Sequence, residues 1–484
     1  MGTADLVRML ISDARSELRT DPQIREDVDA QLAACQRRID EPLRVALAGT
    51  LKSGKSTLLN ALVGEEIAPT DATECTRVVT WFARSDTPRV DVTHDGGHHT
   101  GLPVRRTDGR LHLDLGPVSA DRVERLEVGW PSSLLDEYTL IDTPGTSSNS
   151  SDVSARTLEF LTPDEGSCQA DAIVYLMRSL HSADVALLRS LHEHAGTGRG
   201  ALGIVGVLSR ADETDGGCTA SLDAARRLSA QLRTDRELTG LHRDFLPVSG
   251  LLALRGRTLR QHEFTTLAQL AALPSGVLEA ALVSPGRFIT TDLAIPAPDR
   301  QLLLTAFGMV GVRIAISLVH SGARDAPALA AELVRHSGLD QLRDTLRTRF
   351  GSRHLQLKAH SALRTLRSIL LRHRSPRTVR IFRAADRLLA DSHCFTELRV
   401  LAGLADLPVP EPTRIALDHV LGGRGISPST RLGLPADASP AHTRAIALQA
   451  LRYWRDQLSV PLLDQPTIQS YQAAIRSCEA IIAG

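Results

Sequence analysis

The chain has 484 residues, of which 42% are hydrophobic and 23% are charged, as in an ordinary folded protein. This length exceeds what a single hydrophobic core usually organises, so we expect two domains. The formal net charge is zero, which excludes a global electrostatic attraction to nucleic acid or anionic lipid. Any electrostatic docking must therefore be local, and we expect no nucleic-acid partner.

Cysteine usage and the N-terminus both indicate the cytoplasm. The six cysteines lie far apart, without a C-x-x-C pair or a nearby histidine that would build a zinc site. The first residues follow an amphipathic pattern with charges throughout, unlike the uninterrupted apolar stretch of a secretory signal. We therefore expect reduced thiols and a cytoplasmic protein.

The N-terminal half begins with helices and continues as alternating strands and helices. Residues 3–38 have apolar side chains at helical intervals, and Pro42 ends this pattern. Residues 78–140 show β-type alternation, with hairpin turns expected at 95–97 and 108–109. The strands expected in a parallel α/β sheet are 43–48, 138–141, 172–177, 203–208 and 245–248.

Beyond about residue 255 only helical patterns remain. The expected helices are 259–283, 300–320, 325–372, 377–402 and 440–483, with proline-rich linkers at 407–412 and 427–440. The N-terminal helices have no strand context of their own, so packing against the C-terminal helices is the simplest way to bury their apolar faces.

An apolar run at 302–319 approaches the length of a membrane span. Arg313 lies within it, and a cation near the centre of a bilayer costs roughly 2.5 to 3.5 kcal/mol. We therefore interpret this segment as a buried helix of the stalk rather than as a transmembrane helix.

The strand at 43–48 is followed by a glycine-rich loop and a helix running through Val63. The loop matches G-x-x-x-x-G-K-[ST], in the strand-to-helix context that a phosphate-binding loop requires. Its glycines let backbone N–H groups wrap a phosphate chain, the lysine neutralises the β/γ oxygens, and the serine after it ligates Mg²⁺. The residues are Gly49, Thr50, Leu51, Lys52, Ser53, Gly54, Lys55, Ser56 and Thr57.

A second motif, Asp142-Thr143-Pro144-Gly145, follows the strand at 138–141. Asp142 can hold a magnesium-bound water at the end of this strand, and the N–H of Gly145 can hydrogen-bond a γ-phosphate and report its loss. Between the two motifs lie Thr70, Thr73 and Thr76, and Thr76 is our choice for the threonine that reaches Mg²⁺ and the γ-phosphate. The metal ligands expected are therefore Ser56, Thr76 and Asp142.

A third motif, Ser209-Arg210-Ala211-Asp212, ends the strand at 203–208 and resembles the guanine signature [NT]-K-x-D. Asp212 can accept both N1–H and N2–H₂ of guanine, a pattern that adenine does not offer, and Arg210 can stack on the base. The alternative for Asp212 is a helix N-cap. Ser249 and Gly250 follow the next strand, where a backbone N–H would contact the guanine carbonyl.

These motifs in this order, between N-terminal helices and a helical C-terminal half, resemble the bacterial dynamin-like proteins. Within that family the chain is most similar to the isoniazid-inducible members of mycobacteria, the shorter kind in particular. The resemblance covers roughly residues 43–255, and beyond them it depends on helical pattern and on the segment at 337–350. It implies N-terminal neck helices at 1–40, an α/β P-loop GTPase domain with a mixed, mostly parallel sheet at 41–255, connecting helices at 256–300, and an all-α helical-bundle neck and stalk at 301–484.

The resemblance also implies function. Members of the family hydrolyse GTP to GDP with Mg²⁺, pair their G domains across the nucleotide and act on membranes through a stalk tip, and the mycobacterial relatives are associated with tolerance of cell-wall drugs. We therefore expect a homodimer or an association with a longer paralogue, and peripheral contact with lipid at the inner face of the plasma membrane. Candidate tips are the turn at 373–376, beside an arginine cluster, and the segment 403–440.

Dynamins have Gln-Ser where this chain has Leu51 and Lys52. Leu51 cannot orient water, so this role must pass to the backbone or to a residue such as Thr76. Lys52 stands where guanylate-binding relatives place an internal arginine finger, so we expect either a catalytic cation or an exposed, solvated lysine. The sequence also leaves open a soluble regulatory GTPase whose helical half binds a protein or RNA, and an ATPase.

Overall fold

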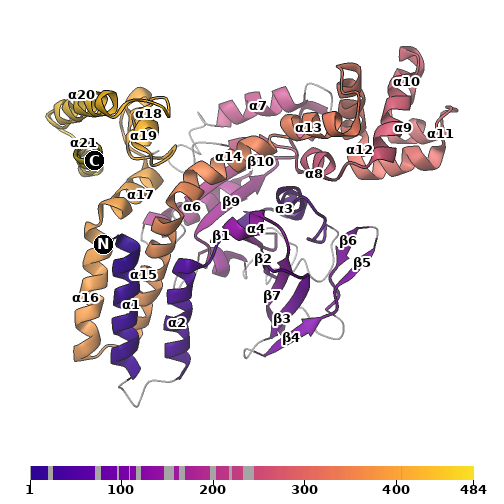
Figure 1. Ribbon diagram of the computed structural model, residues 1–484. Helices are drawn as coiled ribbons and strands as arrows, with labels where there is room; N and C mark the ends of the chain where they lie inside the picture. The colour runs from indigo at the N-terminus through magenta and orange to yellow at the C-terminus, as the bar shows by residue number, and fades with distance from the viewer. Residues whose placement is uncertain are drawn as a thin grey trace.

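The computed structural model describes residues 2–19, 26–70, 78–94, 98–107, 109–115, 122–145, 157–162, 169–196, 203–216, 221–232, 245–404 and 406–484 (Figure 1). A central sheet has helices on both faces. A bundle of long helices extends from one side of the sheet, and a second group of helices lies at the opposite side (Figure 1). The predicted fold class, an α/β nucleotide domain joined to a helical bundle, is confirmed.

The central sheet is mixed, with strand order β11-β10-β9-β1-β8-β2-β7-β3-β4. From β11 to β8 all neighbours are parallel, β2 is antiparallel to β8, β7 is parallel to β2, and β3 and β4 continue antiparallel. The strands are β1 (Leu43–Gly49), β2 (Thr80–Arg84), β3 (Arg89–His94), β4 (His99–Leu102), β7 (Val123–Trp130), β8 (Tyr138–Asp142), β9 (Ala172–Met177), β10 (Gly203–Ser209) and β11 (Phe245–Val248). All five strands predicted for the parallel part are confirmed.

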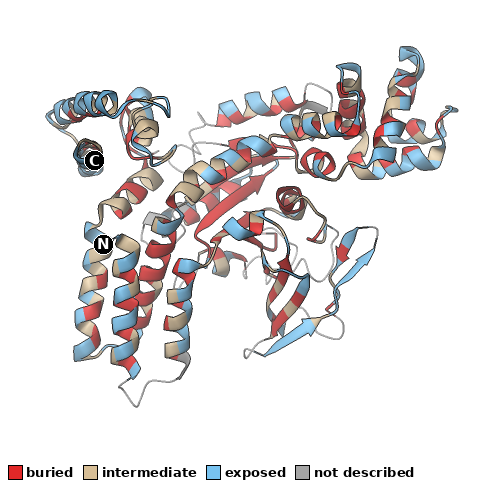
Figure 2. Ribbon diagram, in the orientation of Figure 1, coloured by how far each residue is buried: buried red, intermediate tan, exposed pale blue. Residues whose placement is uncertain are grey.

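Burial explains why the parallel strands are apolar along their whole length. Each residue of β9 is buried, and β1 is buried except at Arg44, because helices cover both faces of this part of the sheet (Figure 2). β3 and β4 form a predicted hairpin, and a separate two-stranded hairpin joins β5 (Arg105–Thr107) to β6 (Arg110–His112). The hairpin turns 95–97 and Asp108 lie outside the described residues.

Helices that cover the sheet follow the strands in the expected alternation. They are α3 (Lys55–Val63), α4 (Leu134–Glu137), α6 (Ser182–Gly196), the 3₁₀ helix η3 (Ala211–Gly216), α7 (Ser221–Leu232) and α8 (Gly250–Thr258).

A group of helices packs beside this domain, on the side away from the bundle (Figure 1). It comprises α9 (Gln261–Ala271), α10 (Ser275–Ala281), α11 (Pro285–Thr290), α12 (Ala297–His320) and α13 (Ala326–Ser337). These helices share one hydrophobic core with the face of the sheet that contains Ile173 and Tyr175. The expected domain boundary at residue 300 stays a prediction, but this core runs across it.

Helix α12 contains the apolar run that the sequence suggested was a stalk helix. It is long and apolar enough to span a membrane by length and composition, but Leu303, Phe307, Val312 and other side chains are buried against neighbouring helices. Arg313 donates hydrogen bonds to the carbonyl of Leu282. The helix packs within the protein, as predicted, with 44% of its apolar window buried. The predicted location in the stalk was wrong, because α12 packs on α8 and α9 and not in the bundle.

The bundle combines the N-terminal helices with helices of the C-terminal half, as predicted. Helices α1 (Thr3–Arg19) and α2 (Glu26–Asp40) pack against α15 (His354–Arg372) and α16 (Pro376–Asp391), and the turn at 373–376 lies at its free end (Figure 1). Ser375 caps α16 by accepting from the N–H of Thr378, and Pro376 occupies the first turn, so the chain reverses sharply here.

The expected continuous helix at 325–372 is instead broken between the nucleotide domain and the bundle. Helix α14 (Leu339–Thr345) continues as the π-helix η4 (Leu346–Phe350) and the 3₁₀ helix η5 (Gly351–Arg353) before α15 begins. Phe350 packs on Gly203 at the start of β10, where a Cβ would lie 2.5 Å from its ring. We call residues 346–353 the corner, since the chain passes here from the sheet to the bundle.

The last part of the chain has its own hydrophobic core. Helix α17 (His393–Gly403) leads into α18 (Glu411–Val420), α19 (Pro428–Arg431), α20 (Pro440–Leu458) and α21 (Gln465–Ala483). Leu417, Trp454 and Tyr471 are buried together in this core. The prediction of linkers at 407–412 and 427–440 was wrong for α18 and α19, because Leu407, Val409 and Leu421 make this segment part of the core.

Candidate nucleotide-binding site

The glycine-rich loop has the backbone that phosphate binding requires. It joins β1 to the N-terminus of α3, and Gly49, Lys52 and Gly54 all have positive φ, at 148°, 61° and 90°. A Cβ at Gly49 would lie 2.1 Å from the carbonyl oxygen of Leu176 in β9, so this position requires glycine. Lys52 has a left-handed backbone conformation, which non-glycine residues rarely adopt outside functional sites.

The side chain of Lys55 lies inside the loop. Its Nζ donates hydrogen bonds to the carbonyls of Gly49 and Thr50, each at 3.1 Å, and burial lowers the pKa of this lysine. Ser53 Oγ is also buried, and it has no hydrogen-bond partner among the described residues. Both groups are therefore held in the loop where a phosphate chain would pass.

Ser56 and Asp142 bring the first two motifs together. Ser56 Oγ donates a 2.6 Å hydrogen bond to Asp142 Oδ2, and Asp142 Oδ1 is buried without a partner among the described residues. Burial raises the pKa of Asp142, whereas the Lys55 charge and the Ser56 hydrogen bond lower it, and the net result is an increase. A buried carboxylate oxygen with no donor beside a serine hydroxyl fits Mg²⁺, which prefers oxygen ligands.

Protein side chains alone do not form a complete metal site here. Within the described parts of the chain, no group of three His, Cys, Asp or Glu side chains could hold a metal ion. Magnesium usually binds through one or two protein ligands together with water and substrate phosphate oxygens. Ser56 and Asp142 match that mode.

Gly145 places the second motif against the phosphate loop. A Cβ on Gly145 would lie 2.8 Å from the Cα of Leu51, so any larger residue would push the two loops apart. Thr143 anchors the segment by donating from Oγ1 to the carbonyl of Leu47 in β1, at 2.8 Å. Gly145 is thus next to the loop where a γ-phosphate would lie.

The first and third motifs form the walls of one pocket of about 150 Å³. Its lining comprises Ser53, Gly54, Thr57, Leu58, Leu176, Val207, Ser209, Arg210, Asp212, Glu213, Val248, Gly250 and Leu251. These residues come from the loop, from the ends of β9, β10 and β11, and from the segments after β10 and β11. A pocket at the carboxyl ends of parallel strands is the usual ligand site of such a sheet.

Asp212 lines this pocket and is almost fully buried. Burial raises its pKa, and a hydrogen bond from Ser249 opposes this change. Ser249 also caps α8, since its Oγ accepts from the N–H of Leu252 at 3.2 Å. The predicted third motif and the predicted Ser249-Gly250 segment therefore lie side by side.

Comparisons with known proteins agree with this geometry. Residues 45–205 match the model of the Dynamin family. Isoniazid-induced protein IniC of Mycobacterium tuberculosis is 43% identical over 490 residues, which cover 100% of this chain and 99% of that protein. The chain is a bacterial dynamin-like protein. It belongs to the same family as IniC along its whole length.

Two further relatives match the N-terminal part more distantly. Isoniazid-induced protein IniA of Mycobacterium tuberculosis is 34% identical over 127 residues, 25% of this chain and 20% of that protein. The bacterial dynamin-like protein of Nostoc punctiforme is 28% identical over 170 residues, 32% of this chain and 23% of that protein. A dynamin-family nucleotide domain indicates a GTPase that binds GTP and GDP.

Glu213 lines the pocket of this dynamin-like protein, but the motifs in the sequence did not predict it as a site residue. Its carboxylate accepts from Arg210 at 2.7 Å and from Arg178, at the end of β9, at 3.1 Å. Arg210 has a left-handed backbone, with φ of 52°, and its guanidinium is held at the rim of the pocket. In the sequence, Glu213 could have been noticed as an acidic residue directly after the segment that resembles the guanine signature. Its pairing with Arg178 depends on the fold.

Several predicted site residues are not brought into contact with the others. The side chains of Leu51 and Lys52 are exposed, and no hydrogen bond or ion pair of Lys52 is described. Thr73 and Thr76 lie outside the described residues, and Thr70 is exposed. The roles expected for Lys52 and Thr76 therefore stay predictions.

Proposed function

We propose that this dynamin-like protein binds GTP with Mg²⁺ and hydrolyses it to GDP and phosphate. The observation that carries the proposal is the shared pocket, in which the phosphate loop and the Ser209-to-Asp212 segment form adjoining walls. The phosphates would follow the N–H groups from Gly49 to Thr57, and the base would lie between Arg210 and Gly250, with Asp212 as the guanine acceptor.

Each residue has a distinct role in this proposal. Lys55 neutralises the β/γ oxygens, the N–H of Gly145 binds the γ-phosphate, and Ser56, Asp142 and Thr76 hold the metal. Mg²⁺, when bound, would neutralise negative charge that develops on the phosphate oxygens in the transition state. Burial of Lys55 strengthens its interaction with phosphate, since the local dielectric constant is low.

Lys52 is proposed as the internal cation that completes the site. Its exposure and left-handed backbone support a role at a surface that a second G domain covers. In that dimer Lys52 would fold over the β/γ bridge, which in comparable systems contributes about 10³ to 10⁵ in rate. Leu51 beside it cannot orient the attacking water, so Thr76 or a backbone group is proposed for that role.

Hydrolysis is proposed to couple pairing of G domains to movement of the bundle and to peripheral membrane binding at the inner face of the plasma membrane. The pairing is proposed between identical chains or with a longer paralogue, for which the partial similarity to IniA is the support. The name of the relative IniC supports a link to drug-induced stress.

Competition between nucleotides tests the proposal. A fluorescent GDP analogue should bind the purified protein, and GTP and GDP should displace it far better than ATP or ADP. Equal competition by ATP would identify an ATPase, and no binding in the presence of Mg²⁺ would refute the proposed site. Lys55→Ala should abolish binding.

Turnover at increasing protein concentration tests Lys52. The wild type should be stimulated as G domains pair, and Lys52→Ala should lose this stimulation while it retains GDP affinity. Arg226→Ala, an exposed cation on α7, is the matched control. Unchanged stimulation in Lys52→Ala would show that Lys52 is a solvated surface lysine.

A further inference from the structure

The C-terminal helices form a unit with a core of their own. Residues 404–484, the C-terminal unit, bury Leu417, Leu451, Trp454 and Tyr471 in a cluster that is separate from the cores of the sheet and the bundle. Helix α17 precedes this unit, and its Phe395 and Leu398 belong to the core of the bundle. The unit therefore has the core that an independently moving body needs.

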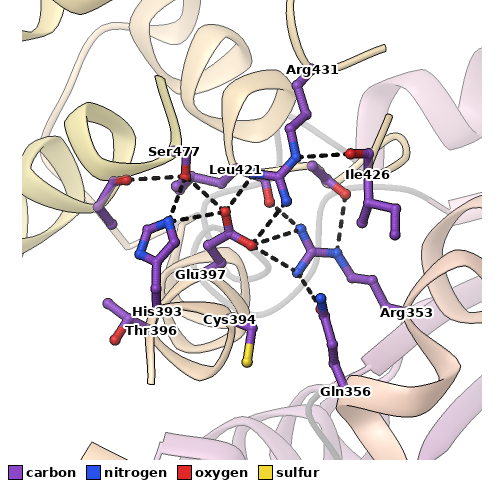
Figure 3. Close-up of polar contacts among 12 residues, drawn as sticks. Arg353, Gln356, His393, Cys394, Thr396, Glu397, Leu421, Ile426, Arg431 and Ser477 are labelled. Carbon is purple, nitrogen blue, oxygen red and sulfur yellow. Dashed lines mark hydrogen bonds and ion pairs between the residues drawn. The ribbon is translucent and has the colours of Figure 1, made fainter. Parts of the chain in front are cut away.

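Two apolar side chains of α17, Val400 and Leu401, pack against the core of this unit, and beside them lies a buried polar network. Glu397 of α17 lies at its centre and is 2% exposed. Arg431 of α19 binds it with both terminal nitrogens, at 2.5 and 3.1 Å, and Ser477 of α21 donates to it at 2.7 Å (Figure 3). Both partners belong to the C-terminal unit, whereas Glu397 belongs to α17.

Arg353 connects the same network to the corner. Both of its terminal nitrogens lie 3.5 Å from Glu397 Oε2, and its side chain donates to the carbonyls of Leu421 and Gly422 between α18 and α19 (Figure 3). Arg353 is the last residue of η5, so the C-terminal unit contacts the corner between the sheet and the bundle.

The geometry of Gly422 shows how closely the unit fits on Arg353. Gly422 has φ of 77°, and a Cβ there would lie 2.5 Å from Arg353 Nη2. The chain at 422 therefore approaches the guanidinium more closely than any other residue type allows.

The corner itself has the irregular helix geometry that often marks a hinge. The helical path changes from α to π to 3₁₀ within residues 346–353, between segments that are regular on both sides. Helix α17 also packs on α6 of the G domain, so the network lies where the G domain, the bundle and the C-terminal unit meet.

From these contacts we propose that Glu397, Arg353 and Arg431 form a latch that reversibly docks the C-terminal unit onto the corner. When the latch is closed, the unit fixes the corner; when it opens, the unit moves as a folded body and the corner is freed. An ionic contact suits this role, because a buried charge network specifies one geometry of the contact. The latch extends the proposed movement of the bundle but does not depend on GTP hydrolysis.

Hydrogen–deuterium exchange on the full-length protein without nucleotide tests the latch. Glu397→Gln keeps the shape of the side chain and removes its charge, which leaves two guanidinium groups without a counterion. We expect exchange at 346–357 and at 417–431 to rise about tenfold or more. Exchange within α20 and α21 should not change, because their core is intact when the unit moves as a body.

Controls distinguish the latch from a general loss of stability. Glu479→Gln removes an exposed ion pair with Arg455 inside the unit and should change exchange at neither site. If exchange rises everywhere in Glu397→Gln, Gly422→Ala is the second variant, since it keeps every charge while its Cβ would crowd both Arg353 and Arg431. The latch is refuted if exchange at 346–353 is unchanged in whichever variant folds. It is also refuted if α20 and α21 lose protection together with residues 417–431.

Failure of the latch and failure of the proposed GTPase would be separate results. The exchange experiment uses no nucleotide, so its outcome does not depend on whether GTP binds. Small-angle scattering of the same samples should give a larger radius of gyration for Glu397→Gln than for the wild type. An identical radius in both would also contradict release of the unit.

Discussion

Arg38 and Asp171 form a buried ion pair that joins the bundle to the nucleotide domain. Arg38 Nη2 of α2 lies 2.9 Å from Asp171 Oδ1, and both side chains are less than a tenth exposed. The other carboxylate oxygen of Asp171 accepts from the backbone N–H of Arg44 in β1. Burial alone would raise the pKa of Asp171, but the charge of Arg38 and these hydrogen bonds outweigh it and lower the pKa.

Removal of this pair should strongly destabilise the protein. Arg38→Met leaves the Asp171 carboxylate buried without its counterion, which costs about 3 to 5 kcal/mol in comparable sites. The measurement is the free energy of unfolding in urea. Arg226→Ala, which removes an exposed ion pair with Asp223, should cost about 1 kcal/mol or less. Equal losses in the two variants would contradict this assignment.

Asp142→Asn should remove the effect of magnesium on nucleotide binding. The substitution keeps the shape of the side chain but replaces one carboxylate oxygen by a donor, which a cation repels. In the wild type, chelation of Mg²⁺ should weaken GTP binding measured by calorimetry. In Asp142→Asn the affinity should already be low and should not respond to chelation. Asp136→Asn, at the exposed pair with Arg84, is the control.

Glu213→Gln should weaken binding of guanine nucleotides without changing the fold. Glu213 holds Arg210 at the rim of the pocket, and loss of its charge frees the guanidinium from the position where it can cover the base. These groups are partly exposed, so we expect a loss of about 1 kcal/mol in the binding free energy of GDP. The melting temperature without nucleotide should match the wild type. A variant that binds GDP as tightly as the wild type would exclude this role.

The stabilising effect of Glu397 should decrease in acid. Burial by itself raises the pKa of Glu397, but hydrogen bonds from His393 and Arg431 and the charges of Arg431 and Arg353 lower it to about 2. A lowered folded-state pKa stabilises the protein above the unfolded value, near 4.5, and this stabilisation is lost as the pH falls towards the folded value.

The measurement for Glu397 is the difference in unfolding free energy between the wild type and Glu397→Gln. From the shift in pKa, the contribution of the ionised carboxylate is about 3 kcal/mol near neutral pH, and about half of it should be lost by about pH 3. A difference that does not change with pH would show that shape, and not charge, is what Glu397 contributes.

Local sequence patterns predicted much of the fold and of the site. The apolar runs of the parallel strands, the glycine-rich loop and the Asp142 motif each have a short-range signal, since the strand period and the loop chemistry depend on neighbouring residues. The pairing of the N-terminal and C-terminal helices followed from their unpartnered apolar faces. Helix α18 was missed, because prolines at 408, 410 and 412 suggested a linker although Pro412 occupies the first turn of that helix.

The sequence by itself determined that the glycine-rich loop, Asp142 and Asp212 lie at or just after the carboxyl ends of strands, because each motif is encoded by contiguous residues. The tertiary structure decided which distant groups meet: Arg178 with Glu213, Arg38 with Asp171, and Glu397 with Arg353. A buried charge destabilises the fold unless it is paired, so each of these groups pairs with the opposite charge that the fold places beside it. Those partners lie tens of residues apart, and only packing of the whole chain selects them.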